Sequence, residues 1–439
     1  MEEATIGAIL AIGAAIFIGF FGDLIFRKLR VPDVLFLIAL GIVIGPEVLG
    51  KSLGIDILPP PDEMAMIQDI FLTVALAVIL FDGGLNTNIK AVVQSMRLSL
   101  VMAVLTLITE ITLVALVLHF VLDLDLMVSL LLGSIIGGPT SAIVIPVMSK
   151  MRVPQKTKAM LVMESVLTDV LVIVTAITII NVIQIGEVEP LMIAWNLAVK
   201  FLVGGLVGLG AGIGWLFVLQ KLRDQPLSYM LTVGALFIIV AAVEISPINS
   251  SGAVAALAFG LTLGNREFVK KRMTSRTLTF PSNEHIQHFS TEITFFVRTF
   301  FFVYLGLMFS FSTFGDIHMV AGLVVISVIC LSRRMTSIFV ARIGDLEEDD
   351  ANAVFASMPR GLAAAVLATL PATALEGMPV WENVPAWIQP VDAFFLNVVL
   401  IVIVGTTVIS TILAYATERG IDKRRRIALR RRLAQDSEI

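Results

Sequence analysis

Residues 161–170 read LVMESVLTDV and place two carboxylic acids, Glu164 and Asp169, inside an apolar stretch long enough to cross a lipid bilayer. An ionisable side chain at the centre of a membrane costs on the order of 2.5–3.5 kcal/mol on insertion scales. Such residues usually persist because they bind or move a charged species. The stretch therefore predicts a membrane protein that handles cations or protons.

The composition of the whole chain agrees with a membrane location. The 439 residues are 57% hydrophobic and only 15% charged, and the mean hydropathy is +0.94. Soluble proteins carry about 25% charged residues. We therefore expect an all-α polytopic membrane protein, with the lipid bilayer as a partner and no nucleic acid.

Apolar segments of the length that spans a bilayer core, about 17–25 residues, indicate thirteen transmembrane helices. We expect them at residues 4–26, 33–50, 66–85, 97–122, 125–148, 157–183, 193–222, 227–245, 249–264, 284–311, 317–343, 350–375 and 392–417. After the last span, residues 419–439 form a strongly basic tail.

The distribution of basic residues favours an odd number of spans. If the tail lies in the cytoplasm, every second loop should be rich in Lys and Arg. Those loops and the tail together hold 25 of the 31 basic residues, whereas the opposing loops are mainly acidic. We therefore expect a multi-pass protein of the cell membrane with its N-terminus outside and its C-terminus in the cytoplasm.

Two of the expected spans are interrupted near their centres. The fifth contains GGPTS at residues 137–141, and the twelfth contains PRG at residues 359–361. Proline lacks a backbone donor and clashes with the preceding helical turn, and a broken helix at membrane depth needs protein or water to satisfy the freed backbone groups. Breaks at matching positions of two halves are typical of inverted repeats in transporters. We expect two inverted six-helix repeats with crossing interrupted helices; two ordinary proline kinks are the alternative.

The sixth span carries its acids on two neighbouring faces. At about 100° per residue, Asp169 shares a face with Ser165, and Glu164 shares the next face with Thr168. A buried charge needs a partner. The basic residues within spans that could supply one are Arg298, Arg333, Arg334 and Arg360. We assign Arg334 to Glu164 as a structural ion pair, which leaves Asp169 without a basic partner.

At these residues the chain resembles the monovalent cation:proton antiporters, specifically the NhaP-type sodium/proton exchangers. The matching motifs are ESVLTD at 164–169, FDGGL at 81–85, FFVYLGL at 301–307 and RGLAAAV at 360–366, together with an arginine in the eleventh span. The resemblance implies an NhaA-like antiporter fold over residues 1–418 and a homodimer. In it, residues 97–183 and 317–418 form a mobile transport core, residues 1–96 and 193–311 form the dimerisation part, and residues 419–439 form a cytoplasmic tail.

The resemblance also implies roles for individual residues. Asp169 is implied as the carboxylate that binds a proton or a cation in turn, Ser165 as a ligand beside it, and Asp82 as an accessory acid on the ion path. For Asp82, a cap at a helix end is the alternative. Glu164 and Arg334 are implied as the pair that stabilises the core; Arg334 is preferred over its neighbour because the pattern Arg-x-x-x-Ile-Phe follows it. The expected site is completed by Gly137 and Thr140 as binding residues and by Gly138, Pro139, Thr168 and Arg360 as supporting residues.

Two positions depart from the family pattern. Thr168 stands before Asp169 where these exchangers usually have Asn, and the fifth-span break reads Gly137-Gly138-Pro139 where they usually have Thr-Asp-Pro. The break thus lacks an acid, and we expect Thr140 or Ser141 to compensate for it. The threonine and the arginine of the ion pair indicate the electroneutral branch.

The sequence therefore predicts a secondary active antiporter, not an enzyme, that exchanges Na⁺, K⁺ or Li⁺ for H⁺ in a 1:1 ratio, and the family resemblance implies an elevator-type movement. No cofactor and no permanently bound metal are expected, only the transported cation at Asp169. A cation channel or a ligand-gated K⁺ efflux system on the same fold is the main alternative, followed by an organic-anion symporter. An intramembrane metalloprotease would need a His-Glu-x-x-His helix, which the sequence lacks. The roles of Glu110, Glu292 and Arg298 stay open.

Overall fold

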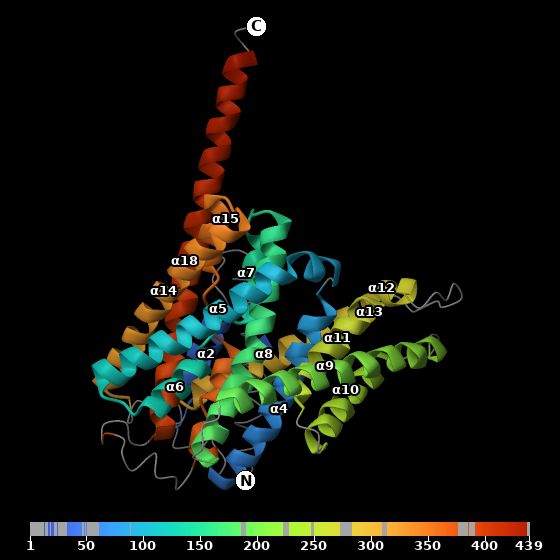
Figure 1. Cartoon of the computed structure of the whole chain (residues 1–439), viewed down its shortest axis with the longest axis vertical. Coiled ribbons are helices and arrows are strands. Elements are labelled where there is room, and N and C mark those ends of the chain that lie inside the picture. The colour runs from blue at the N-terminus through green and yellow to red at the C-terminus, as the bar shows by residue number, and fades with distance from the viewer. Residues whose placement is uncertain are drawn as a thin grey trace.

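The computed structural model describes residues 33–45, 61–87, 89–185, 190–222, 228–246, 250–272, 283–309, 314–375 and 391–436, together with a few isolated positions. Within these ranges every regular element is a helix (Figure 1).

The described helices lie in the following order along the chain. First come α2 (Asp33–Ile44), α4 (Pro61–Leu85), α5 (Ile89–Leu122), α6 (Leu126–Ile135), α7 (Ser141–Lys150), α8 (Gln155–Ile185) and α9 (Pro190–Lys221). They are followed by α10 (Ser228–Ile245), α11 (Gly252–Gly264), α12 (Arg266–Arg272), α13 (Asn283–Leu307), α14 (Asp316–Gly344), α15 (Glu348–Ala356), α16 (Leu362–Leu367), α17 (Leu370–Ala374) and α18 (Val391–Asp436).

The helices agree with the spans expected from the sequence. Six of the described helices contain segments long and apolar enough to cross a membrane, namely α5, α8, α9, α13, α14 and α18, and five shorter apolar helices accompany them. Each expected span from the second to the thirteenth coincides with one helix, except the fifth, which corresponds to α6 and α7, and the twelfth, which corresponds to α15, α16 and α17. Of the first expected span only scattered positions between 13 and 24 are described, and these are helical.

Both predicted helix breaks are present. One lies between α6 and α7, where Thr140 has extended backbone angles (φ −94°, ψ 137°). The other lies between α15 and α16, where Gly361 leaves the helical region (φ −161°, ψ −134°). The two extended segments meet, because the backbone N–H of Thr140 donates a hydrogen bond of 3.0 Å to the carbonyl of Pro359. The alternative of two simple proline kinks is therefore wrong.

The helices pack in two groups that meet along α8, α13 and α16. In one group α4, α9, α10, α11 and α13 pack together, and α2 packs on α13. In the other, α5 to α8 pack with α14, α15 and α18. Figure 1 shows α9 to α13 on one side of the molecule and α14, α15 and α18 on the other. Val170 and Val174 of α8 join the apolar cluster of α4 and α11, so α8 links the two groups.

The last helix, α18, runs for 46 residues without interruption. It passes through the basic segment that follows the thirteenth span and projects beyond the other helices (Figure 1). The segment is rich in Arg and also contains Leu and Ala, all of which have high helix propensity. The basic tail therefore continues the last membrane helix as one element.

Candidate functional site

Asp169 lies where α8 passes the break between α6 and α7. Its side chain is buried, and one carboxylate oxygen, Oδ2, accepts two hydrogen bonds from Ser141: one from the backbone N–H at 2.9 Å and one from the hydroxyl at 2.6 Å. The Thr140 side chain also interacts with this carboxylate. Ser141 is the first residue of α7. The carboxylate thus occupies the N-terminus of a half-helix, where unpaired N–H groups and the helix dipole favour negative charge.

No Lys or Arg among the described residues forms an ion pair with Asp169. The nearby positive charge is that of Arg360, which acts on Asp169 electrostatically while it pairs with a different acid. The site is therefore a carboxylate surrounded by hydroxyl and amide groups. Oxygen ligands of this kind suit hard cations.

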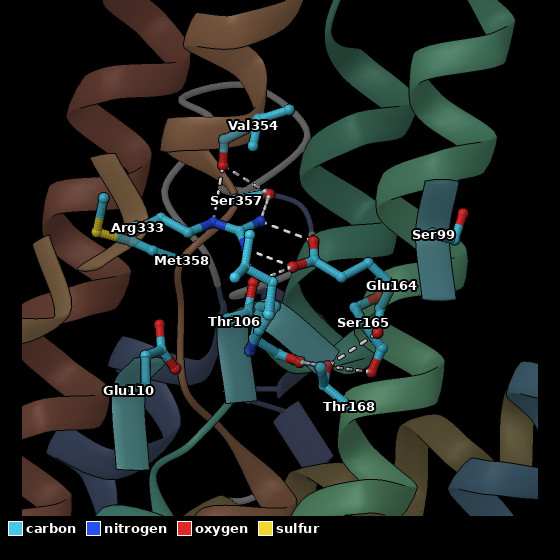
Figure 2. A network of polar contacts seen from close by, with 12 residues as sticks. Ser99, Thr106, Glu110, Glu164, Ser165, Thr168, Arg333, Val354, Ser357 and Met358 are labelled. Atoms are coloured by element: carbon cyan, nitrogen blue, oxygen red, sulfur yellow. Dashed lines mark hydrogen bonds and ion pairs between the residues drawn. The ribbon is translucent and has the colours of Figure 1, made fainter. Parts of the chain in front are cut away.

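Glu164, one helical turn before Thr168, forms a buried ion pair with Arg333 of α14. Figure 2 shows the two groups facing each other, with Val354 and Ser357 on one side and Thr106 on the other. Arg333 Nη1 pairs with Glu164 Oε1, and Nη2 donates to Oε2 at 2.7 Å. The guanidinium also donates to the Val354 carbonyl at 2.9 Å and to the hydroxyls of Thr106 and Ser357. A single arginine thereby ties together α5, α8, α14 and the C-terminal end of α15.

The prediction that Arg334 pairs with Glu164 is wrong. Arg334 is exposed, and its guanidinium lies 5.4 Å from the centroid of the Phe355 ring. The two neighbouring arginines point about 100° apart on the helix, so only one of them can face α8. The polar residues of α14 carried the missing signal: Ser332, Thr336 and Ser337 are buried on the side of Arg333. Apolar residues do not reveal which side of a membrane helix faces the protein interior, because the side that faces lipid is apolar as well.

Thr168 attaches α8 to the break. Its hydroxyl donates to the carbonyl of Pro139 at 2.9 Å and also lies near two carbonyls of its own helix. A Cβ atom at Gly138 would stand 2.6 Å from the Cβ of Thr168, closer than any real contact. The two positions that depart from the family pattern, 138 and 168, are therefore packed against each other. With threonine at 168 packed this closely, position 138 has no room for an aspartate.

A second buried ion pair lies at the other break and was not assigned from the sequence. Arg360 Nη2 is 2.6 Å from Glu110 Oε2, and both side chains are fully buried. The Arg360 Nη1 group donates to the carbonyl of Met358 at 2.8 Å, and its backbone N–H donates to the Thr406 hydroxyl at 3.1 Å. Glu110 lies near the middle of α5, a helix we expected to be an ordinary span, and no local motif marks it.

Other expected site residues make their described contacts with groups other than the Asp169 carboxylate. The Ser165 hydroxyl is buried and donates to the Val162 carbonyl of its own helix at 2.9 Å. Asp82, on α4 in the other helix group, accepts hydrogen bonds from Ser290 at 2.8 Å and from the Asn86 side chain at 3.0 Å. Gly137 packs against Leu107 of α5. None of the hydrogen bonds or ion pairs in the described part of the chain joins Ser165 or Asp82 to Asp169.

A helical membrane protein in which two broken helices cross beside a buried carboxylate has the architecture of a secondary transporter. The comparison with known families agrees. The transmembrane model of the sodium/hydrogen exchangers matches residues 12–415, and the chain belongs to that family.

Individual relatives come from bacteria and archaea. The chain is 25% identical over 416 residues to Na⁺/H⁺ antiporter 1 of Methanocaldococcus jannaschii, covering 92% of this chain and 90% of the relative. It is 28% identical over 271 residues to the K⁺/H⁺ antiporter NhaP of Alkalimonas amylolytica, covering 60% of this chain but only 45% of that protein. The solved structure of the sodium proton antiporter MjNhaP1 from M. jannaschii superimposes with a TM-score of 0.75 at 22% identity, covering 93% of this chain and 99% of that one. The predicted all-α antiporter fold is confirmed, and the two predicted interrupted helices are in contact.

Proposed function

We propose that this protein exchanges a monovalent alkali cation for a proton across the membrane, with Asp169 as the group that binds each in turn. The observation that carries the proposal is the environment of Asp169. It is a buried carboxylate at the crossing of two broken helices, held by Ser141 but without an ion-pair partner among the described residues. Its negative charge is therefore available to a transported ion.

The charges around the site support a one-for-one exchange. Glu164 is neutralised by Arg333 and Glu110 by Arg360, so among the described residues of the site Asp169 carries the buried charge that has no ion-pair partner. A bare carboxylate is costly to move through a low-dielectric barrier. Either one proton or one monovalent cation cancels its charge. Because only a loaded site can move cheaply, the two ions exchange, and one turnover moves no net charge.

The two helix groups offer the parts for an elevator-type movement. The group of α5 to α8, α14, α15 and α18 carries Asp169 and both ion pairs, so it would move as the transport core. The other group would form the fixed part and the interface of a homodimer; it consists of α4, α9, α10, α11 and α13. Asp82 belongs to the fixed group, and we assign it to the ion path between the groups. The basic tail then faces the cytoplasm of the cell, and the N-terminus faces outside.

The cation is an alkali ion, and the relatives include antiporters named for Na⁺ and for K⁺. The test is proton flux into proteoliposomes after addition of each chloride salt in turn. The wild-type protein should give cation-dependent flux with Na⁺, K⁺ or Li⁺, and Asp169→Asn should abolish it. Asp82→Asn, as a comparison, should reduce the rate without abolishing it. Retained exchange in Asp169→Asn would refute the assignment, and cation flux without counter-movement of protons would indicate a channel.

A further inference from the structure

We propose that Glu110 is a positioning residue of the ion site: its carboxylate neutralises Arg360, so that the arginine does not compete with the transported ion for Asp169. This inference rests on the proposed exchange function and extends it to a residue outside the helix breaks. Glu110 belongs to α5, whereas the ion-binding carboxylate belongs to α8.

The geometry shows a dedicated pair. Both side chains are completely buried, and 2.6 Å separates Arg360 Nη2 from Glu110 Oε2. The Arg360 guanidinium donates to the Met358 carbonyl, and the backbone N–H of the same residue donates to the Thr406 hydroxyl. The positive charge is therefore buried at the break between α15 and α16. A buried charge held in this way needs a counter-charge nearby.

The charged groups that act on this pair lie on α8 and α14. Arg333 of α14 and Glu164 of α8 both act electrostatically on Glu110, in addition to Arg360. Arg360 acts in turn on Asp169 of α8 and on the Cys330 thiol of α14. Arg333 already pairs with Glu164. Among the described residues, Glu110 is thus the one acid that forms an ion pair with Arg360.

The break between α6 and α7 cannot supply the negative charge that Arg360 needs. Its residues 137–141 are GGPTS, without an acid, and Thr168 leaves no room for a side chain at 138. The two breaks are in direct contact through Thr140 and Pro359. If Glu110 were neutral, the other acids on which Arg360 acts would be Glu164, which is already paired with Arg333, and Asp169. Asp169 would then be held by an internal cation and would bind both transported ions more weakly.

The decisive variant is Glu110→Gln, which keeps the shape of the side chain and removes its charge. We expect exchange to continue in proteoliposomes with the KM for the cation raised about tenfold, equivalent to about 1.4 kcal/mol. We also expect the pH of half-maximal activity to fall, because a positive neighbour favours the ionised carboxylate. A purely structural role for Glu110 would lower thermal stability and maximal rate but leave both KM and the pH profile unchanged.

Two matched variants separate charge from shape and from position. Glu110→Asp keeps the charge and should behave much like wild type. Glu292→Gln removes an acid from an exposed position of α13 and should change neither parameter. If Glu110→Gln and Glu110→Asp changed the KM and the pH profile equally, the proposal would be overturned, because the geometry of the side chain and not its charge would then matter. So would a wild-type KM and pH profile in Glu110→Gln.

A double variant gives an independent check. In Glu110→Gln with Arg360→Gln both members of the pair are neutral, so the KM should return towards the wild-type value if the protein folds. A folded double variant with a KM as high as that of Glu110→Gln would contradict the proposal. Failure of the exchange function itself is recognised separately, since the wild-type protein would then show no cation-dependent proton flux at all.

Discussion

The backbone N–H of Thr140 donates a hydrogen bond of 3.0 Å to the carbonyl of Pro359, and through it each broken helix satisfies a backbone group of the other. Thr140 precedes Ser141, which donates to Asp169, and Pro359 precedes Arg360, which pairs with Glu110. One backbone contact therefore connects the Asp169 carboxylate with the ion pair of Arg360 and Glu110. Such contacts explain how extended backbone is tolerated at membrane depth.

Replacing Arg333 should be far more damaging than replacing Arg334. Arg333→Ala leaves Glu164 as an uncompensated buried charge, at a cost of about 3–5 kcal/mol, and also removes donors to three helices. Arg334→Ala removes only a cation–π contact at an exposed site, worth about 0.5–1 kcal/mol. Thermal unfolding of the two purified variants in detergent measures the difference. Equal stability of the two would show that the pair with Glu164 contributes little.

Gly138→Ala should destabilise the protein by about 1–3 kcal/mol, the usual cost of overpacking a filled interior. The added methyl group would lie 2.6 Å from the Cβ of Thr168 and push α8 away from the break. The measurement is the unfolding temperature together with the exchange rate. Gly210→Ala is a suitable control, because nothing lies within 4 Å of a Cβ at that position of α9. A Gly138→Ala protein as stable and active as wild type would mean that the break relaxes easily.

Thr168→Val should weaken the attachment of α8 to the break. Valine has nearly the same shape but cannot donate to the Pro139 carbonyl, so we expect a loss of about 0.5–1.5 kcal/mol in stability. Thr178→Val is the matched control, since the Thr178 hydroxyl bonds only within its own helix. A larger loss in the control than in Thr168→Val would argue against this role of the hydroxyl.

Ser141→Ala should raise the KM for the cation about tenfold, because hydrogen bonds to charged groups contribute about 1.5–3 kcal/mol. The variant keeps the backbone N–H but removes the hydroxyl that lies 2.6 Å from Asp169. Ser165→Ala provides the comparison, as that hydroxyl bonds to its own helix. If Ser165→Ala had the larger effect on KM, Ser165 would be the ligand, as the family resemblance implies.

Arg424→Ala should change stability by less than about 1 kcal/mol. Arg424 of α18 pairs with Glu348 and Asp349 in the first turn of α15, but its side chain is half exposed. Exposed ion pairs contribute about 0–1 kcal/mol and are screened by salt. Unfolding measured at low and high salt tests this. A salt-independent loss of several kcal/mol would show that the contact acts by packing.

The sequence was most informative where a rule depends on local residues. Proline and glycine in apolar spans predicted both breaks, and span lengths predicted the helices, because backbone hydrogen bonding in lipid allows few other structures. It was least informative about which helix faces meet. Arg333 and Arg334 are adjacent and both could reach an acid, and Glu110 pairs with an arginine 250 positions later along the chain. Such pairings depend on tertiary packing, which no motif within a single span records.

The unbroken course of α18 has a mechanical consequence. At 1.5 Å per residue its 46 residues form a rod of about 69 Å, and its inner part packs on α14 and α15. A stiff rod clamped at one end amplifies a small tilt at its far end. A tilt of a few degrees in the core would therefore displace the distal, arginine-rich turns by several ångströms. A spectroscopic label placed there would report this movement.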